Sequence, residues 1–502
     1  MSDSGAERGR REVTRLVVVS NRLPVVVEKD PDGGHRLVPG SGGLVTALAP
    51  VLAERGGLWI GWPGSSVENG FDELLAEAGR DVGYRLVAQP LSEDDVENYY
   101  YGFANQVLWP VFHDLPGRAL HEPRFWQSYR RVNDAFARTI AKHSTSDDFV
   151  WVHDYHLMLV ASALRAHGID RPLGFFLHTP FPPLDIFLRL PRRLEILRGL
   201  LAYDLIGVQT QRDRRNLIQC LRALVRNVRV RSSGSLSTVD LADGRRVRIG
   251  SFPISIDFKE FSDGARAPDV VESAERLRGQ FRAPTLMLGV DRLDYTKGIP
   301  QRLSAFEYAL EEVPALRRRL TLIQVVVPSR RQLPEYDSLK RTIDRRIGEI
   351  NGRFSEPGWT PVHYIYGSLE RRELLAYYRA ADIALVTPIK DGMNLVVKEF
   401  CAASPDKRAL PVLSEFTGAA SQMHRHALMV NPNDVEGTAA AIRQAVEMPA
   451  PERDRRAEAL RRGVRRQDIF WWVNCFLEAA LHRRVSDFPI IPGYVEQLDL
   501  AR

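Results

Sequence analysis

Short apolar runs alternate with amphipathic segments along most of the chain, and polar clusters follow many of the runs. In the first half the runs predict buried strands at Arg15–Val19, Leu58–Trp62, Phe149–Val152, Leu173–Leu177 and Leu205–Val208. Apolar positions three and four residues apart predict helices at Leu44–Ala53, Glu93–Trp109, Phe125–Lys142, His156–Ala166 and Arg212–Val225. Turn residues predict a hairpin over Val25–Glu28 and His35–Val38, and Val228–Ile249 is expected to be a polar hairpin insert.

The same alternation starts again after Phe252–Ile256. Strands are predicted at Leu286–Val290, Leu320–Val327, Val362–Tyr366, Ile383–Val386 and Ala409–Leu413, each followed by a helical segment. A long, Arg-rich helix is predicted over Arg453–His482. Strands that alternate with helices of this kind indicate βαβ units and parallel sheets.

Two such blocks, divided near residue 255, predict an α/β protein with two doubly wound, Rossmann-like domains facing a central cleft. We expect a disordered N-terminus over residues 1–14, a first domain over 15–254, and a second domain over 255–470. Residues 471–502 are expected to form a C-terminal helix and tail that crosses back to the first domain. In such sheets ligands bind beyond the carboxyl ends of the strands, so functional residues should follow the strands directly.

Composition narrows the class of protein. The chain has 502 residues and a net charge of +6, and aromatic residues are not interleaved with its basic clusters, which argues against a nucleic-acid partner. The N-terminal segment has no apolar signal core, and no run is long and apolar enough to span a bilayer. Cys220, Cys401 and Cys475 have neither disulfide nor zinc spacing. We therefore expect a cytoplasmic protein that does not bind membranes, and a homo-oligomer remains open.

The segment Val290–Pro300 joins a predicted strand to a predicted helix and carries two cations, Arg292 and Lys297. The positive end of the helix dipole adds to these charges, so the loop is suited to hold a diphosphate. The alternative is that the two cations pair with Asp291 and Asp294 in a solvated loop.

Polar and aromatic residues follow other strands of the first half. Arg22 comes directly after the first strand and is either an anion ligand or a surface cation. Gly42 and Gly43 precede a helix, where unhindered amides could approach a phosphate, although a glycine pair is also simply a turn. Tyr100 and Trp109 are nine residues apart on a helical segment, so they should not lie on one face of it. They are either core aromatics or the walls of a sugar pocket.

Histidines gather at two further strand ends. His153 and His156 are three residues apart, but a third ligand is missing, which disfavours a metal site. Asp154, between them, is better suited to accept hydrogen bonds from a hydroxylated substrate. His178 ends a strand shortly before a proline-rich loop and is either a structural residue or a ligand contact.

The second half has its own strand-end cluster. Arg330 follows a strand and adds a cation, and Asp391 and Gly392 lie where a helix should begin. Glu399, two turns further along, could accept hydrogen bonds from two ribose hydroxyls. The alternatives are an ordinary helix-terminal charge and a solvated helix face. No Asp-x-Asp signature stands at a strand end, which disfavours a metal-dependent sugar transferase.

The strand-end motifs occur in one order along residues 15–480: Ser20-Asn21-Arg22, Gly42-Gly43-Leu44, Trp59-Ile60-Gly61-Trp62, Val107-Leu108-Trp109-Pro110, His153-Asp154-Tyr155-His156, Phe175 to Pro182, Val290 to Pro300, and Asp391 to Glu399. In this order they resemble the trehalose-6-phosphate synthase family, family 20 of the retaining GT-B glycosyltransferases. The resemblance implies transfer of glucose from a nucleotide-glucose, most readily UDP-glucose, to glucose 6-phosphate. The product would be α,α-trehalose 6-phosphate, and the nucleotide-sugar is a co-substrate, so neither a cofactor nor a metal is expected.

The resemblance also implies roles for particular residues. The donor would be bound by Gly42, Gly43, Arg292, Lys297, Leu369, Leu374, Asp391, Leu395, Val396 and Glu399. The acceptor would be bound by Arg22, Trp62, Tyr100, Trp109, Asp154 and Arg330. The residues expected to act in catalysis are Arg292, Lys297, Asp391 and His178. Trp109 and Thr179 would set anomer selectivity, and Thr179 stands where many family members have Ile.

Two rival interpretations share this scaffold. One is a pseudo-glycosyltransferase resembling validoxylamine 7′-phosphate synthase, which joins cyclitols through nitrogen. The other is an inactive regulatory subunit that binds sugar phosphates. The Gly42-Gly43 pair and Trp109 favour a true sugar transferase, and the nucleotide base remains open between UDP, GDP and ADP.

Overall fold

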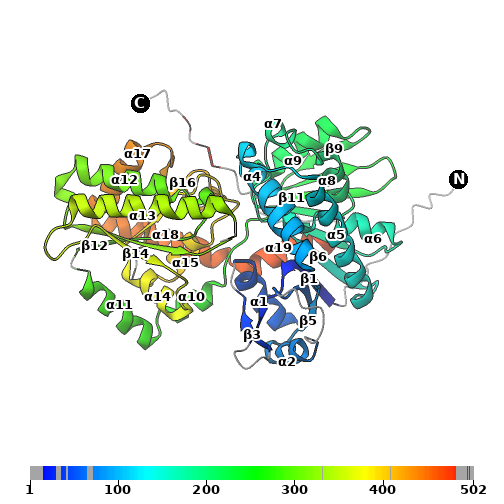
Figure 1. Ribbon diagram of the computed structural model, residues 1–502, viewed down its shortest axis with the longest axis horizontal. Coiled ribbons are helices and arrows are strands. Elements are labelled where there is room, and N and C mark those ends of the chain that lie inside the picture. The colour runs from blue at the N-terminus through cyan, green and yellow to red at the C-terminus, as the bar shows by residue number, and fades with distance from the viewer. Residues whose placement is uncertain are drawn as a thin grey trace. The chain divides into compact units, whose positions relative to one another are not determined.

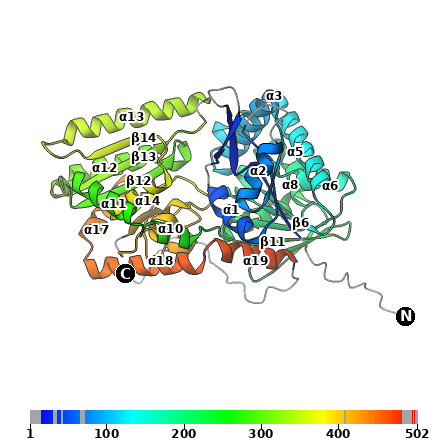
Figure 2. The same cartoon turned by 90° about the horizontal axis from the view of Figure 1, so that it is seen from below.

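The computed structural model describes residues 15–29, 35–40, 43–64, 72–281, 283–330, 332–406, 409–481, 494–495 and 497. These residues form two compact units (Figures 1 and 2). The first contains the described parts of Met1–Phe252 and Val473–Ile490, and the second contains those of Pro253–Trp472 and Ile491–Arg502. The N-terminus predicted to be disordered, residues 1–14, lies outside the described residues, as does most of the tail after Leu481.

The first unit is built on a nine-stranded sheet with the order β5-β4-β1-β6-β7-β8-β11-β10-β9. Its strands are β1 (Arg15–Arg22), β4 (Leu58–Trp62), β5 (Arg85–Ala88), β6 (Asp148–His153), β7 (Leu173–Phe176), β8 (Leu205–Val208), β9 (Arg229–Ser233), β10 (Leu236–Asp240) and β11 (Arg246–Ser251). The first six strands in this order pair in parallel, and their connections reverse direction between β1 and β6. That reversal is the switch point at which doubly wound sheets bind their ligands.

The polar insert differs from the single hairpin predicted for it. It forms three strands, and β11 pairs in parallel with β8 with Ile249 opposite Ile206. Val239, Val247 and Ile249 are buried, and the neighbours of Val247 along its strand are more exposed, so the insert contributes an apolar face to the main sheet. The separate hairpin predicted near the N-terminus is confirmed as β2 (Val25–Lys29) and β3 (His35–Pro39).

Helices connect the strands of the first unit. The α-helices are α1 (Gly43–Arg55), α2 (Asp72–Val82), α3 (Glu93–Asp95), α4 (Trp109–Phe112), α5 (Pro123–His143), α6 (Val160–Ala166), α7 (Leu184–Phe187), α8 (Arg193–Leu200) and α9 (Gln211–Leu224). Short 3₁₀ turns lie at η2 (Pro116–Arg118) and η3 (Tyr155–Leu157). The helix predicted from His156 therefore begins later, at Val160, because a 3₁₀ turn first carries the chain away from β6.

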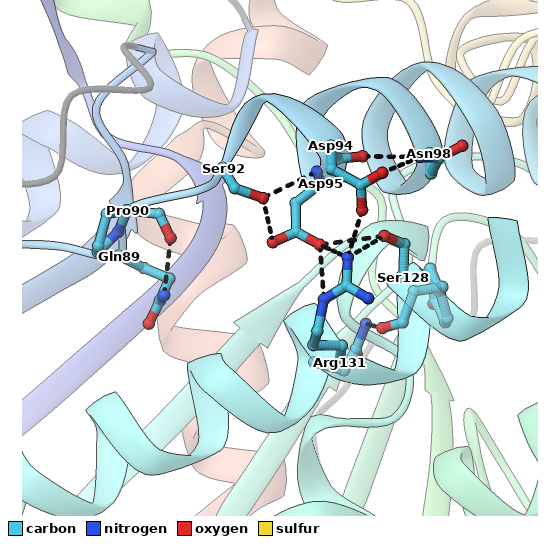
Figure 3. A network of polar contacts seen from close by, with 10 residues as sticks. Gln89, Pro90, Ser92, Asp94, Asp95, Asn98, Ser128 and Arg131 are labelled. Atoms are coloured by element: carbon cyan, nitrogen blue, oxygen red, sulfur yellow. Dashed lines mark hydrogen bonds and ion pairs between the residues drawn. The ribbon is translucent and has the colours of Figure 1, made fainter. Parts of the chain in front are cut away.

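The helix predicted over Glu93–Trp109 is confirmed as helical, but most of it, η1 (Val96–Leu108), has π-helical hydrogen bonding. Asn105 Nδ2 donates to the carbonyl of Tyr100 at 2.7 Å, which occupies a backbone acceptor inside the widened turn. A guanidinium clamp holds α3, which leads directly into the start of η1, onto α5: Arg131 donates to Asp94 at 2.7 Å and to Asp95 at 2.5 Å (Figure 3). Ser128 adds a hydrogen bond to Asp95.

The second unit is built on a six-stranded, wholly parallel sheet with the order β14-β13-β12-β15-β16-β17. Its strands are β12 (Thr285–Arg292), β13 (Leu320–Val327), β14 (Val362–Tyr366), β15 (Ile383–Val386), β16 (Leu410–Ser414) and β17 (Leu428–Val430). This is the Rossmann order, with its switch point between β12 and β15. The pattern of apolar runs predicted five of these strands and missed β17, which has only three residues.

Helices cover both faces of this second sheet, with α12 and α13 on one side and α11 and α14 on the other (Figure 1). The helices and 3₁₀ turns are α10 (Phe258–Gly264), α11 (Pro268–Gln280), η4 (Tyr295–Lys297), α12 (Ile299–Glu312), η5 (Pro314–Leu316), α13 (Pro334–Phe354), α14 (Arg371–Ala380), α15 (Val396–Ala402), α16 (Ala420–Met423), α17 (Val435–Glu447) and α18 (Ala450–Arg466). None of the described helices is both long enough and apolar enough to cross a bilayer.

The single long helix predicted near the C-terminus is instead two helices, α18 and α19 (Ile469–Leu481). The break falls at Gln467–Asp468, where the Asp468 carboxylate accepts a hydrogen bond from the Trp471 amide and starts the second helix. From α19, Phe476 stacks on Trp151 of β6 with ring centroids 4.3 Å apart. Gly174 and Gly207 leave the space that this ring fills, since a Cβ at either position would lie within 3.0 Å of it.

Candidate functional site

At the switch point of the first unit, Arg22 ends β1 beside two aromatic rings. Its guanidinium carbon lies 4.4 Å from the Trp62 ring centroid and 5.3 Å from that of Tyr100. Gly61 permits the close approach of β4, because a Cβ there would lie 2.7 Å from the Arg22 carbonyl carbon. Cation–π contact thus fixes the arginine without neutralising its charge, which suits it to hold an anion.

Asp154 follows β6 at the same switch point in a backbone conformation that L-residues rarely adopt, with φ 75° and ψ 166°. Its amide donates to the Phe176 carbonyl at 2.7 Å, and its carboxylate accepts a hydrogen bond from the His178 amide at 3.2 Å. Strain of this kind persists only where surrounding structure holds it, and it is concentrated at ligand sites. The aspartate of the predicted cluster is therefore positioned by the end of β7.

Tyr100 and Trp109 approach the same pair of rings, against the expectation that they lie on different faces. Tyr100 stacks on His156 with centroids 5.9 Å apart, Trp109 lies 5.8 Å from Tyr155, and those two neighbours are themselves 4.0 Å apart. In the π-helical segment each turn holds more than four residues, so nine residues make about two turns. The two predicted acceptor aromatics are therefore brought together by the helix type.

His153, for which a metal site was disfavoured from the sequence, lies beside the other strand-end histidine, His178. His153 Nδ1 lies 3.1 Å from His178 Nε2, a hydrogen bond that needs one ring to donate and the other to accept. Burial lowers the pKa of His178 to about 3 and the pKa of His153 well below its ordinary value, so both rings are neutral at pH 7. No group of three potential ligands arranged for a metal occurs among the described residues. Next to His178, the Thr179 hydroxyl is buried without a hydrogen-bond partner in the described structure.

At the switch point of the second unit, two loops meet. Lys297, after β12, donates from Nζ to Oδ2 of Asp391, after β15, at 2.6 Å, and their side chains are only 12% and 14% exposed. The Ile389 amide donates to the Thr296 carbonyl at 2.8 Å and ties the same loops. Gly298 makes this approach possible, because its φ is 63° and a Cβ would lie 2.2 Å from the Thr387 carbonyl oxygen.

The remaining carboxylates of the first of these loops have other partners. Asp291 pairs with the fully buried Arg302 at 2.5 Å, and Asp294 pairs with Arg330 at 3.0 Å. Burial by itself would raise the pKa of Asp294, but Arg330, Arg292 and Lys297 together hold that pKa below its ordinary value. The sequence left open that Lys297 pairs with Asp291 or Asp294. In the structure those two carboxylates pair with Arg302 and Arg330, and Lys297 pairs with Asp391. Arg330, predicted to bind the acceptor phosphate, is largely buried and also donates to the Tyr336 hydroxyl.

The Asp391–Glu399 segment is shaped by Asn394 within it and by the loop that follows β16. Asn394 has a φ of 78°, donates to Asp391, and accepts a hydrogen bond from the Val397 amide. Gly418 allows the loop after β16 to lie against this segment, since a Cβ there would be 1.9 Å from the Gly392 carbonyl oxygen. Leu395 and Val396 are half-buried at the start of α15.

Glu399, the predicted ribose ligand, lies on α15 and accepts a hydrogen bond from the Tyr378 hydroxyl at 2.8 Å. Burial raises the pKa of Glu399, with the Tyr378 bond working in the opposite direction. Leu369 and Leu374, predicted to bind the base, are half-buried around the start of α14. Gly42 lies outside the described residues, and Gly43 begins α1.

Several residues that position these groups were not identified from the sequence. Tyr378, Asn394 and Gly418 each hold a predicted donor residue in place, and Arg302 holds the loop that carries Lys297. In the sequence Arg302 resembles any helix-surface arginine, and nothing marks its burial. The sequence did contain one signal for the shape of this loop. Gly298 directly follows Lys297, and a glycine at that position indicates a sharp turn.

The chain has the GT-B fold of glycosyltransferases, with two Rossmann-like sheets and a polar cluster at the switch point of each, as its similarity to solved members shows. The profile described as Glycosyltransferase family 20 matches residues 14–482. The chain belongs to glycosyltransferase family 20 and is an enzyme of that family.

Named relatives agree with this assignment. A trehalose-6-phosphate synthase from Mycobacterium sp. (strain JLS) is 41% identical over 488 residues, covering 95% of this chain and 99% of the relative. A solved α,α-trehalose-phosphate synthase (UDP-forming) from Burkholderia xenovorans, in complex with glucose 6-phosphate, has a TM-score of 0.83 and 33% identity and covers 93% of this chain and 99% of its own. A solved structure from E. coli, bound with UDP-2-fluoro glucose, has a TM-score of 0.82 and 34% identity, with coverages of 94% and 100%.

Proposed function

We propose that the chain is a retaining trehalose-6-phosphate synthase that transfers glucose from a nucleotide-glucose to glucose 6-phosphate. The observation that carries this proposal is near full-length similarity, 41% over 95% of the chain, to a relative named for that activity. The neighbour in complex with glucose 6-phosphate supports the acceptor, and the neighbour bound with UDP-2-fluoro glucose supports UDP-glucose as the donor.

The donor half of the reaction belongs to the second unit, which corresponds to the proposed domain 255–470. Arg292 and Lys297 would contact the diphosphate, together with the amides around Leu395 and Val396. Glu399 would accept hydrogen bonds from the ribose. Leu369 and Leu374 would contact the base, and Gly42 and Gly43 of the first unit would contribute to the same donor.

The acceptor half belongs to the first unit, the proposed domain 15–254. Arg22 is the cation best placed to hold the phosphate of glucose 6-phosphate, because its charge is backed by aromatic rings and, among the described residues, is not paired with a carboxylate. Tyr100 and Trp109 would face the sugar ring and Asp154 its hydroxyls. Arg330 is proposed as a second phosphate contact; its ion pair with Asp294 engages Nη1, and a guanidinium has five N–H donors.

In the proposed mechanism, the bond between the anomeric carbon of glucose and the diphosphate oxygen breaks as the acceptor hydroxyl attacks from the same face. The departing phosphate oxygen accepts the proton of that hydroxyl, so atoms and charge balance without a covalent nucleophile. Arg292 and Lys297 would stabilise the negative charge that develops on the diphosphate. His178, neutral at pH 7, would hydrogen bond to the transferred glucose as a dipole and not as a cation.

The proposed setting is the cytoplasm, supported by the three cysteines, Cys220, Cys401 and Cys475, which are all buried and free. The nucleotide-sugar is a co-substrate, so no separate cofactor is proposed.

The test is a donor panel. Purified protein is incubated with UDP-, GDP- or ADP-glucose and glucose 6-phosphate, and the product is analysed by mass spectrometry and by NMR of its anomeric protons. We expect trehalose 6-phosphate, in which one glycosidic bond joins two anomeric centres that are both α, and the matching nucleoside diphosphate. If no donor yields a disaccharide phosphate, the synthase assignment is wrong and the cyclitol-coupling alternative becomes the better one.

A further inference from the structure

A basic pocket with a volume of about 520 Å³ opens on the first unit, between α7, α9 and the outermost strand β9. Arg214, Arg215 and Arg222 line it together with Leu184, Ile218 and Ser232. In the sheet order, five strands separate β9 from β1, which carries Arg22. The pocket is therefore a different place from the switch-point cluster.

The three arginines lie on one side of α9, because Arg222 follows Arg215 by seven positions and Arg214 by eight, and such spacings return to the same side of a helix. None of the residues that line the pocket is acidic. Three like charges on one helix face destabilise each other when no counter-charge is present. Burial is the larger cause that lowers the pKa of Arg214, and the positive charge of Arg215 lowers that pKa further.

The hydrogen bonding of these arginines is incomplete. Arg214 donates from Nη1 to the Gly234 carbonyl at 3.2 Å, but its Nε is buried without a partner in the described structure. Over the same described ranges, Arg215 and Arg222 form neither a hydrogen bond nor an ion pair. A buried guanidinium donor without an acceptor is costly, and a ligand with several anionic oxygens would satisfy it.

A second arginine-rich pocket on the same unit provides a contrast. It has a volume of about 500 Å³ and is lined by Arg130, Arg192 and Arg198, but Glu195 is also in its wall. Arg192 donates to Glu195 at 3.2 Å, so this pocket contains its own counter-charge. The pocket on α9 has none.

We propose that the α9 pocket binds a small phosphorylated molecule, at a site separate from those for the two substrates. Guanidinium groups match phosphate oxygens in paired hydrogen bonds, and arginine is the preferred residue for such recognition. Leu184 and Ile218 offer an apolar wall for the carbon skeleton of the ligand. The volume lies within the roughly 300–1,000 Å³ of small-molecule sites.

The experiment compares three full-length proteins by isothermal titration calorimetry with two probes, inorganic pyrophosphate and AMP. The proteins are the wild type, the variant Arg215→Ala/Arg222→Ala, and the matched control Arg130→Ala/Arg198→Ala, which loses the same charge from the other pocket. We expect at least tenfold weaker probe binding, or loss of one binding site, in the α9 variant and less than a twofold change in the control. Pyrophosphate binding alone would indicate an inorganic anion as ligand, and tighter AMP binding an organic phosphate.

Folding can be checked separately, because Arg215 and Arg222 are exposed and their removal leaves no group without a partner. The α9 variant should unfold at a temperature no lower than the wild type, and pyrophosphate should raise that temperature less than it does for the control. Equal weakening in both variants would indicate a general charge effect and overturn the proposal. So would unchanged probe binding accompanied by altered sedimentation of the α9 variant, which would mark this face as a protein interface.

Discussion

At the scale of single residues, Lys297 is the cation whose surroundings best suit stabilisation of a leaving group. Its ammonium group is held 2.6 Å from Asp391, and both side chains are mostly buried. Solvent screens buried charges less than exposed ones, and Asp391 offsets much of the ammonium charge until the more negative diphosphate of a donor competes for it. Asp391 also fixes the position of the ammonium before a donor arrives.

We predict that Lys297→Ala lowers kcat by about 100- to 1,000-fold, or roughly 2.7–4 kcal/mol, as for the loss of a donor to a developing oxyanion. Initial rates with UDP-glucose and glucose 6-phosphate measure the effect. The matched control is Lys340→Ala on α13, which removes a lysine that also pairs with an aspartate, Asp344. A kcat near the wild-type value for Lys297→Ala would exclude the leaving-group role.

The sequence identified the chemistry-bearing residues at this scale better than it identified their partners. Arg292, Lys297 and Asp391 stand out because they lie in the polar loops that follow apolar runs. The pairing of Lys297 with Asp391 joins positions 94 residues apart and depends on β12 lying next to β15. The local pattern of residues does not show which strands lie next to each other. The alternative partners Asp291 and Asp294 therefore could not be excluded without the structure.

At the scale of elements, η1 shows what periodicity can and cannot predict. Apolar spacing identified a helix from Glu93, but an α-helical turn would have separated Tyr100 from Trp109. The π-helical turn brings both to the Tyr155–His156 pair. The hydrogen bonds of the backbone, and the bond from the Asn105 side chain to the Tyr100 carbonyl, decide that this helix is a π-helix. The spacing of hydrophobic residues does not distinguish a π-helix from an α-helix.

The clamp between Arg131 and the start of η1 yields a prediction about the acceptor. Arg131→Ala should raise the KM for glucose 6-phosphate severalfold and leave the KM for the donor unchanged, because Tyr100 and Trp109 are carried by η1 and α4. Since Arg131 is half exposed, the free energy of unfolding should fall by no more than about 1 kcal/mol. Steady-state kinetics with each substrate varied in turn provides the measurement.

The control for this clamp is Arg138→Ala on the same helix α5. Arg138 pairs with Asp134 one turn away and is not bonded to η1. We expect both KM values to stay within twofold of wild type in that variant. A parallel rise in the donor and acceptor KM values of Arg131→Ala would instead indicate general loosening of the first unit.

Strands were easier to predict than the irregular elements between them. The strands of both sheets that bear the site are continuous apolar runs because helices cover both faces of a parallel sheet. The pattern missed the short strands β5 and β17 and the helix α2, and it did not show that a capping group at Asp468 divides one amphipathic run. These failures lie away from the predicted site residues, so the site was affected less than the element boundaries.

At the scale of the whole molecule, the two sheets share one winding pattern. In each, the chain begins at a central strand, adds strands outward on one side, and then adds strands on the other side. The repeated alternation in the sequence predicted this doubling. It did not predict the buried lysine next to the point where the chain leaves the first unit. Lys398, on α15, is 2% exposed and donates from Nζ to the Ile254 carbonyl at 2.6 Å.

Burial lowers the pKa of Lys398 from 10.5 to about 7, so folding favours its neutral form. Between pH 7 and 10.5 the unfolded chain binds a proton that the folded chain lacks, and the free energy of unfolding should therefore rise with pH by up to about 1.4 kcal/mol per unit. Below pH 7 both states are protonated and this contribution is constant. Lys398→Met removes the titrating group, so its stability advantage over wild type at pH 7.5 should shrink steadily toward pH 9.5 in urea unfolding. The exposed Lys259 offers the control, since Lys259→Met should follow the wild-type profile, and parallel profiles for all three proteins would mean that Lys398 stays charged in the folded state.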